Sequence, residues 1–375
     1  MYQDKSYKYQ LDKSSKKYIC PRCGKKTFVL YLDETGHPLD ESVGRCDRQD
    51  KCAFHYTPRE YFKDKGTLGE TSASNKANRR TTRNKVVEPS YIDASIFKAS
   101  IRDYEHNSLM RFLHSVFDNR IGSDSVNRIA MEYAVGTSKQ FGGSPVFWQI
   151  DLSGRIRSGK IMGYNSDNGK RIKEPKVQFG WVHKLMQEHY PEFRLKQSFF
   201  GGHRLKYVSK YMESKNEKCK KMGISNKAEP IIWILESEKA VLITAMALAW
   251  IGAENLFIPV ASGSCENFNP SDEHKRDPFH AIQLLRNRRI VIFPDEGKFD
   301  EWKLKAYGLK GFSSEVYIST VMEKNLHPHP VECAYSAGDA IDDLILAYIR
   351  DGKTVEEVNN LIVESYGYQG QYKVV

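Results

Sequence analysis

Short, continuous apolar runs alternate with helical stretches over the last third of the sequence, and this alternation constrains the fold most strongly. The runs predict strands at residues 231–235, 256–261, 289–293 and 315–318. Helices are predicted between them, at residues 239–249, 278–287 and 300–307. Strands that are apolar on both faces indicate a parallel sheet covered by helices on both sides. We therefore expect an α/β domain over residues 228–350, with a ligand site at the carboxyl ends of its strands.

Acidic side chains follow two of these predicted strands. Glu236 comes directly after the run 231–235, and Asp295 follows the run 289–293. Asp339 and Asp342 lie further along the chain. Carboxylates gathered at strand ends repel one another unless a cation neutralises them, and Mg²⁺ prefers such oxygen ligands. We therefore predict that these four side chains form a site for Mg²⁺ or Mn²⁺.

The order of the acidic motifs resembles the Toprim domain that primases, topoisomerases and some nucleases share. The chain has Glu236-Ser-Glu-Lys-Ala where phage-type primases have Glu-Gly-Glu-x-Asp-Ala, and Pro294-Asp-Glu-Gly where they have Asp-x-Asp. Gly338-Asp-Ala-Ile-Asp stands in place of Lys-Asp-x-Asn-Glu. The resemblance covers about the last third of the chain. It implies a Toprim-like domain in which Asp295 binds the metal and Glu236 is a ligand or a general acid/base.

Two residues depart from the Toprim motifs. Ser237 stands where glycine is usual, and Gly297 replaces the second Asp of Asp-x-Asp. Glu296 could substitute for that Asp, but in an extended segment its side chain points to the opposite face. The loss of one metal ligand affects the expected catalysis more than the expected fold.

Four of the seven cysteines lie between residues 20 and 52. Cys20 and Cys23 form a Cys-x2-Cys pair, and Cys46 and Cys52 follow a predicted β-hairpin. A Cys-x2-Cys turn places two thiolates on one ion, and a second pair closes a tetrahedral site. The spacing between Cys46 and Cys52 is unusual, so His55 remains an alternative fourth ligand. We predict a zinc ribbon with structural Zn²⁺ over residues 16–62.

The segments between the ribbon and the α/β block have different characters. Residues 63–90 contain almost no large apolar side chains and many Gly, Ser, Thr, Asn, Lys and Arg residues, which predicts a basic flexible linker. Residues 91–225 begin with a helical pattern at 108–117 and continue with strand patterns joined by Gly-containing turns. We predict an α+β middle domain there, and a C-terminal helix or tail over residues 351–375.

Basic residues cluster on the predicted hairpin of the middle block, on the loop after it and at the start of a later helix. They are Arg155, Arg157, Lys160, Lys170, Arg171, Lys173 and Lys239. Aromatic residues available for base stacking lie near the hairpin: Trp148, Tyr164 and Trp181. This combination predicts nucleic-acid binding, and the alternative is a solvated sheet face with the aromatic rings in the core. His183 and His203 are candidate polar contacts or ordinary structural histidines.

Most of the chain also resembles a family of mobile-element proteins that combine a zinc ribbon, a domain of unknown function and a Toprim-like end. The matching segments are residues 146–151, 154–162, 181–183, 199–203 and 293–297, together with Trp302. This resemblance implies a role in the replication or mobilisation of a plasmid or another mobile element.

The overall charge limits the kinds of partner. Lys and Arg outnumber Asp and Glu by 57 to 47, a formal net charge of +10 that favours nucleic acid. The longest apolar stretch, residues 240–251, is too short to span a bilayer, and the N-terminus lacks the apolar core of a signal peptide. We therefore expect a cytoplasmic protein without membrane contact. The sequence lacks a Gly-x4-Gly-Lys-Ser/Thr motif, so a helicase of that type would be a separate partner.

Two classes of function are consistent with these features. The Toprim resemblance implies a primase-like nucleotidyltransferase that binds single-stranded DNA and nucleotides, or a nuclease that uses the same site. The other class is a non-catalytic DNA-binding accessory protein with a degenerate Toprim site, which Gly297 favours.

Overall fold

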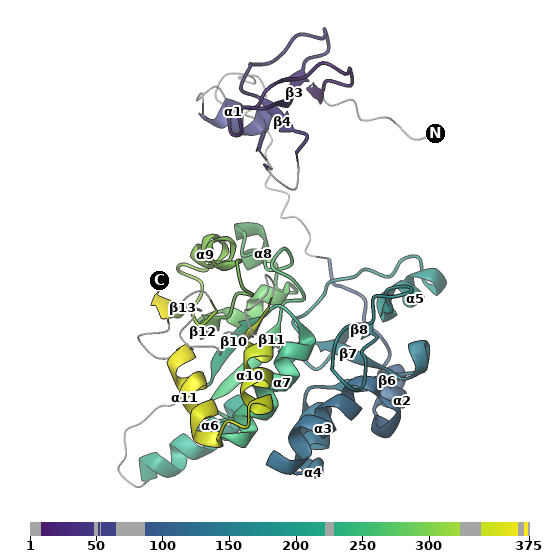
Figure 1. Cartoon of the computed structure of the whole chain (residues 1–375), viewed down its shortest axis with the longest axis vertical. Coiled ribbons are helices and arrows are strands. Elements are labelled where there is room, and N and C mark those ends of the chain that lie inside the picture. The colour runs from purple at the N-terminus through teal and green to yellow at the C-terminus, as the bar shows by residue number, and fades with distance from the viewer. Residues whose placement is uncertain are drawn as a thin grey trace. The chain divides into compact units, whose positions relative to one another are not determined.

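The chain divides into two compact units, unit 1 (Met1–Lys85) and unit 2 (Val86–Val375). A computed structural model of the protein describes residues 9–48, 52, 54–64, 87–221, 229–322, 339–366 and 371–373 (Figure 1). Residues 65–86, which make up most of the predicted linker, lie outside the described residues.

Unit 1 contains an antiparallel sheet built around one central strand. Its strands are β1 (Gln10–Leu11), β2 (Tyr18–Ile19), β3 (Lys26–Leu32), β4 (Gly44–Cys46) and β5 (His55–Tyr56). β3 pairs with β1, β2 and β4, and α1 (Pro58–Asp64) follows β5. The buried side chains Phe28 and Leu30 of β3 pack against Cys20, Cys46 and Cys52. A core this small needs a metal or a disulfide to be stable.

The parallel sheet predicted for the last third of the chain is present in unit 2. Its strands are β10 (Ile231–Leu235), β11 (Phe257–Ala261), β12 (Arg289–Ile292) and β13 (Glu315–Ser319). They run parallel in the order β11-β10-β12-β13, and β14 (Gln371–Lys373) pairs antiparallel with β13. Trp233 and Leu235 point into one core, whereas Ile232 and Ile234 point into another. Both faces of the sheet are therefore buried, as the continuous apolar strands indicate.

Helices cover each face of this sheet (Figure 1). The first face is covered by α3 (Ser108–Ile121), α4 (Ser123–Glu132), α7 (Glu238–Trp250), α10 (Ile341–Arg350) and α11 (Val355–Tyr366). The second face is covered by α6 (Arg204–Lys221), the 3₁₀ helix η4 (Ala281–Leu285) and α9 (Phe299–Tyr307). α7 contacts β10, β11, α3, α4 and α10, which explains why its sequence is apolar on every side.

The middle block forms a second, antiparallel sheet in unit 2. Its strands β6 (Val135–Ser138), β7 (Ser144–Ile150), β8 (Ile156–Met162) and β9 (Phe179–Trp181) pair in sequence order. Around them lie α2 (Ala94–Ser100), η2 (Tyr104–His106), η3 (Gln140–Gly142) and α5 (Val182–His189). Because α3 and α4 also pack against α7, the middle block and the parallel sheet share one core. The domain boundary near residue 226 stays a prediction.

The helix predicted at residues 278–287 is wrong in its extent. The segment contains only η4, and the short helix α8 (Asp272–Arg276) precedes it. The side-chain amide of Gln283 donates to the carbonyls of His274, Lys275 and Asp277, which satisfies these groups without a continuous helix. Asn287 has a φ of 55°, a left-handed conformation that ends the helical segment.

Candidate functional site

The four predicted zinc ligands converge in unit 1. The Sγ atoms of Cys20, Cys23, Cys46 and Cys52 all lie within 4.8 Å of one another. The Sγ–Sγ distance is 3.7 Å between Cys20 and Cys52 and 4.0 Å between Cys23 and Cys46. Thiolates bound to one zinc ion at about 2.3 Å are about 3.8 Å apart in a tetrahedron, so this group fits structural Zn²⁺.

Neighbouring groups support the assignment of the four ligands. A hydrogen bond from the backbone amide of Lys25 lowers the pKa of Cys23 to about 6, which favours the thiolate that binds metal. The Nε2 atom of His55 lies 2.9 Å from the hydroxyl of Tyr31, and the two rings stack. Cys52, rather than His55, therefore occupies the fourth position.

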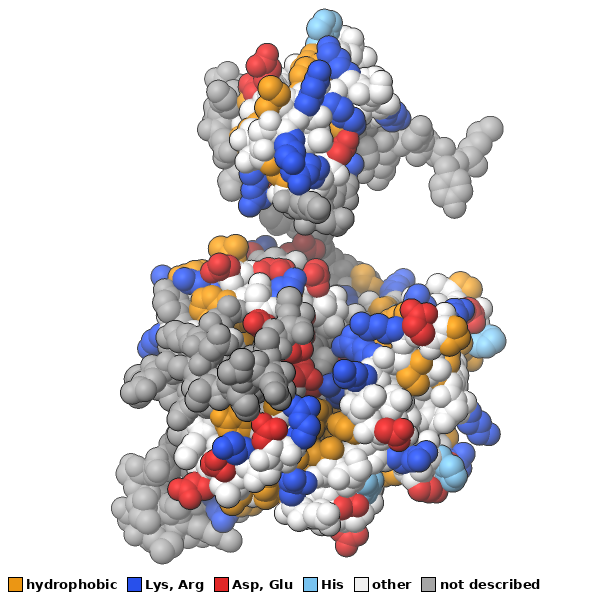
Figure 2. All heavy atoms as spheres, in the orientation of Figure 1, with side chains coloured by type: hydrophobic (Ala, Val, Ile, Leu, Met, Phe, Trp, Pro, Cys, Tyr) orange, Lys and Arg blue, Asp and Glu red, His pale blue; other side chains and the backbone are white. Residues whose placement is uncertain are grey.

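In unit 2 a cavity of about 610 Å³ lies at the carboxyl ends of the parallel strands. Acidic, basic and small residues line it: Gly169, Lys170, Arg171, Lys173, Glu236, Ser237, Lys239, Gly263, Ser264, Asp295, Ala340, Asp342 and Asp343. Figure 2 shows recessed acidic side chains that face basic side chains across a hollow in this unit. The structure thus brings together most of the residues predicted for the Toprim-like site.

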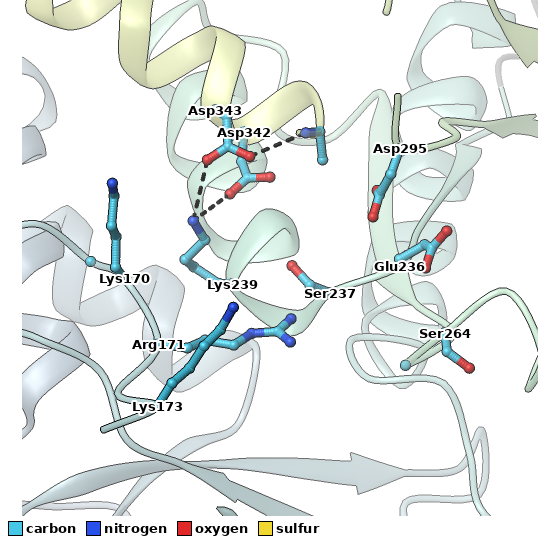
Figure 3. A pocket seen from close by; sticks show the side chains of 13 residues that line it. Lys170, Arg171, Lys173, Glu236, Ser237, Lys239, Ser264, Asp295, Asp342 and Asp343 are labelled. Atoms are coloured by element: carbon cyan, nitrogen blue, oxygen red, sulfur yellow. Dashed lines mark hydrogen bonds and ion pairs between the residues drawn. The ribbon is translucent and has the colours of Figure 1, made fainter. Parts of the chain in front are cut away.

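Glu236 and Asp295 approach the cavity from adjacent strand ends, because they follow the paired strands β10 and β12 (Figure 3). The Nε1–H of Trp302 in α9 donates a hydrogen bond of 2.9 Å to Oε1 of Glu236, which holds this carboxylate in place. Burial and the nearby charge of Glu236 raise the pKa of Asp295 to about 8. Asp295 therefore keeps its proton near neutral pH unless a cation replaces that proton.

Asp342 and Asp343 lie in the first turn of α10, on another side of the cavity (Figure 3). The Nζ of Lys239, in the first turn of α7, is 3.0 Å from Asp342 and 3.6 Å from Asp343. Asp342 is fully buried, and burial raises its pKa while the charge of Lys239 opposes this change. A cation of the protein itself therefore already pairs with the carboxylates on this side of the cavity.

The remaining residues of the acidic motifs have other positions. The backbone carbonyl of Asp339 accepts a 2.8 Å hydrogen bond from the amide of Glu296, and neither residue lines the cavity. Gly297 has a φ of 77°, a conformation that glycine adopts without strain. Ser237 is the N-cap of α7, and its hydroxyl accepts from the amide of Ala240. Within the described residues, only the four cysteines form a group of three or more potential ligands within 4.8 Å.

Three predicted basic residues face the carboxylates. Lys170, Arg171 and Lys173 lie in the loop between β8 and β9 and are exposed on the side of the cavity opposite Glu236 and Asp295 (Figure 3). A backbone bridge between Tyr164 and Arg171 anchors this loop to the end of β8. The arrangement places free positive charge within the same cavity as the two carboxylates.

The other predicted phosphate ligands are paired inside the protein. Arg157 is buried and forms a 2.8 Å ion pair with Asp151, which also pairs with Arg155 at 3.1 Å. Lys160 is buried and forms a 2.6 Å ion pair with Glu238. Since their charges are already neutralised, these residues join β7, β8 and α7 and do not present an open phosphate-binding face.

The aromatic residues and histidines of the middle block also have mainly structural positions. Trp148 and Tyr164 are buried in the core, which agrees with the alternative interpretation of the hairpin. The Nδ1 of His183 lies 2.7 Å from the hydroxyl of Ser158 inside the protein. His203 is held by the carbonyl of Glu132 at 2.9 Å, and burial lowers its pKa to about 4.

Several residues that line the cavity were not among the predicted site residues, including Gly263, Ser264 and Asp343. Gly263 and Ser264 follow β11 at the same edge of the sheet as Glu236 and Asp295. Their position directly after a predicted strand is the sequence feature that could have identified them as cavity residues. Asp343 adjoins the predicted ligand Asp342, and the helical start of α10 places both side chains on Lys239.

The raised pKa of Asp295 predicts a pH dependence of stability. Between about pH 4 and about 8 the folded protein retains a proton on Asp295 that the unfolded chain releases, so the free energy of unfolding falls as pH rises through this window. We expect Asp295→Asn to remove this dependence and to stabilise unit 2 most at pH 8. Urea unfolding of both proteins across this range, without added divalent cations, measures the effect. Parallel pH profiles would contradict the expectation.

Two segments of the chain match protein families. Residues 7–67 match the zinc beta-ribbon finger family, and residues 107–218 match a family described as a domain of unknown function (DUF6371). A search of curated proteins gave no match. The first family match agrees with the four-cysteine geometry of unit 1, which identifies this unit as a zinc ribbon.

Solved structures similar to this chain include several primase fragments. The primase fragment of the bacteriophage T7 primase-helicase protein has a TM-score of 0.36 at 12% identity, covering 94% of this chain and 98% of its own. The Mycobacterium tuberculosis primase RNA polymerase domain, solved with a DNA oligomer, has a TM-score of 0.37 at 11% identity, with coverages of 75% and 79%. The E. coli primase catalytic core has a TM-score of 0.35 at 10% identity, with coverages of 72% and 82%.

Among the described residues, no helix has both the length and the apolar character required to cross a membrane.

Proposed function

We propose that this protein is a primase-like protein that acts on nucleic acid through one divalent cation, Mg²⁺ or Mn²⁺, at Glu236 and Asp295. The observation that carries this proposal is the cavity itself. It combines two carboxylates at adjacent strand ends with the exposed cations Lys170, Arg171 and Lys173. A nucleotide with its metal ion requires oxygen ligands for the metal on one side and phosphate-binding side chains on the other.

The donor set fits Mg²⁺, because this ion is usually held by one or two carboxylates and keeps several waters or phosphate oxygens. When bound, such an ion supplies positive charge that orients phosphates and stabilises the charge developed on them. Trp302 orients Glu236, and Asp295 loses its proton to become a ligand. Lys170 and Arg171 bind the phosphates from the opposite side of the cavity.

The remaining parts of the chain have supporting roles in this proposal. The zinc ribbon binds single-stranded DNA template, and a separate protein supplies helicase activity. The resemblance to mobile-element proteins supports a role in plasmid or mobile-element replication in the cytoplasm. Asp342 stays paired with Lys239 and is not a metal ligand in this proposal.

Primer synthesis on single-stranded DNA with nucleotides and Mg²⁺ or Mn²⁺ tests the proposal directly. We expect Glu236→Gln and Asp295→Asn each to lower the rate by about 100-fold or more, since each removes a charge that acts on the developing phosphate charge. Asp272→Asn, an exposed carboxylate on α8, is the matched control and should keep full activity. Synthesis that is absent in the wild type with both metals, or undiminished in both variants, would refute the proposal.

Two observations favour a non-catalytic DNA-binding accessory protein as the second candidate. Lys239 already pairs with Asp342 and Asp343, and Gly297 stands in place of one ligand of the Toprim motif. This candidate predicts DNA binding that is unchanged in Asp295→Asn and no synthesis by the wild type. A nuclease that uses the same cavity would instead nick DNA in the absence of nucleotides.

A further inference from the structure

Helix α6 presents an exposed face of lysine and tyrosine that the acidic cavity does not use. Leu205, Val208 and Met212 bury the opposite face of this helix against the parallel sheet. On the exposed side, Tyr207 is 69% and Tyr211 is 44% solvent-exposed. The last turns of α6 extend away from the rest of unit 2 (Figure 1). Between residues 206 and 217 this face is thus accessible to a partner.

The spacing of the exposed residues arranges them in two neighbouring rows. One row carries Tyr207, Tyr211 and Lys215, and the other carries Lys206, Lys210 and Ser214, each at intervals of four residues. Residues four apart lie one above the other on a helix, so each row is continuous. The two glutamates of the exposed side, Glu213 and Glu217, form a third row that adjoins the lysine row, since Glu213 follows Lys210 at a spacing of three. The first two rows therefore carry ammonium groups and aromatic rings but no carboxylate.

The two lysines of the second row do not stabilise the helix itself. Lys206 and Lys210 are like charges at a spacing of four, which weakens a helix slightly, whereas α11 and its preceding turn use the opposite-charge pair Lys353–Glu357. In the described part of the chain, no carboxylate lies within ion-pair distance of Lys206, Lys210 or Lys215. The Nζ of Lys215 lies over the ring of Tyr211, 5.5 Å from its centroid, whereas Lys206, Tyr207 and Lys210 are exposed to an outside partner.

We propose that the Lys/Tyr face of α6, defined by Lys206, Tyr207, Lys210, Tyr211 and Lys215, binds single-stranded nucleic acid. Ammonium groups in a row match the phosphate backbone, and exposed tyrosine rings stack on unpaired bases of any sequence. An acidic protein would satisfy the lysines but would not use two rings placed between them. None of these residues lines the acidic cavity, so this surface is a second contact that holds template outside the site.

Fluorescence anisotropy of the full-length protein with a labelled oligo(dT) tests this surface. Tyr207→Ala/Tyr211→Ala should weaken binding at least about tenfold, since it removes two stacking rings. Lys206→Ala/Lys210→Ala should lower the slope of log affinity against log salt by about 1.4, which corresponds to two phosphate contacts. The control Glu213→Ala/Glu217→Ala changes the same helix at its border and should not weaken binding. Thermal unfolding checks that each variant is folded.

Cross-linking locates the contact independently of other DNA-binding surfaces. Oligonucleotides that contain 4-thiothymidine should cross-link to Tyr207 or Tyr211 in the wild type, and mass spectrometry identifies the peptide. Affinity that is unchanged in both surface variants, or cross-links confined to unit 1 or to the loop at Lys170, would overturn the proposal. Displacement of the DNA from this face by poly-glutamate at equal charge concentration would overturn it in favour of an acidic protein partner. The inference does not require primer synthesis, so failure of the catalytic proposal leaves it intact.

Discussion

Removal of zinc from the intact protein should unfold unit 1 and leave unit 2 folded. The core of unit 1 consists mainly of Phe28, Leu30 and the cysteine ligands themselves, so little apolar burial remains when the ion is lost. Structural zinc contributes on the order of 10 kcal/mol to the folding of such small modules. Unit 2 has its own cores on both faces of a parallel sheet and none of the zinc ligands. The two units should therefore respond differently to chelation.

Hydrogen exchange with mass spectrometry measures this difference within one sample. After chelation, the amides of β3 and β4 should lose protection, whereas those of β10 and β12 should keep it. Cys46→Ser, at a buried ligand, should reproduce the loss without chelator, and Cys265→Ser, at a buried cysteine of unit 2, is the control. Protein that contains no zinc as purified, or a unit 1 that stays protected without it, would contradict the assignment.

The zinc ribbon illustrates which part of a site is predictable from sequence. The Cys-x2-Cys pair and a later cysteine pair are local signals, and they identified the module and its four ligands. The fourth position remained open between Cys52 and His55 because the spacing alone allows either. The contact that decides it joins His55 to Tyr31, a residue on a different strand. Only the fold brings these two side chains together.

The same distinction applies to the cavity of unit 2. Continuous apolar runs predicted the parallel sheet, and the carboxyl ends of its strands predicted the position of Glu236 and Asp295. The basic hairpin was interpreted as a phosphate-binding face, but Lys160 pairs with Glu238, which lies 78 residues further along the chain. A sequence pattern shows which residues are charged but not which residues form ion pairs with them. Long-range pairing therefore decided which cations remained free, namely those at Lys170, Arg171 and Lys173.

Among the residues that line the cavity of unit 2, substitution of Lys239 should destabilise the fold most. Its ammonium is the cation at 3.0 Å from the fully buried Asp342, so Lys239→Met leaves an uncompensated charge in the interior. Removal of one partner of a buried ion pair typically costs about 3–5 kcal/mol. Lys239 retains some exposure, which favours a value of about 3 kcal/mol. Urea unfolding near pH 7 measures this change.

A double variant separates the loss of the charge pair from any loss of packing. Lys239→Met/Asp342→Asn removes both charges and should recover most of the stability, because the cost comes from the unpaired carboxylate. Lys298→Met, at an exposed lysine near the same strand ends, is the control and should change stability little. The destabilisation of Lys239→Met should also shrink as pH falls, since burial raises the pKa of Asp342 and protonation of its carboxyl group removes the unpaired charge. The opposite outcome is a loss of stability in Lys239→Met that Asp342→Asn does not recover and that is constant with pH. It would show that Lys239 stabilises the fold through packing and not as a cation of this cavity.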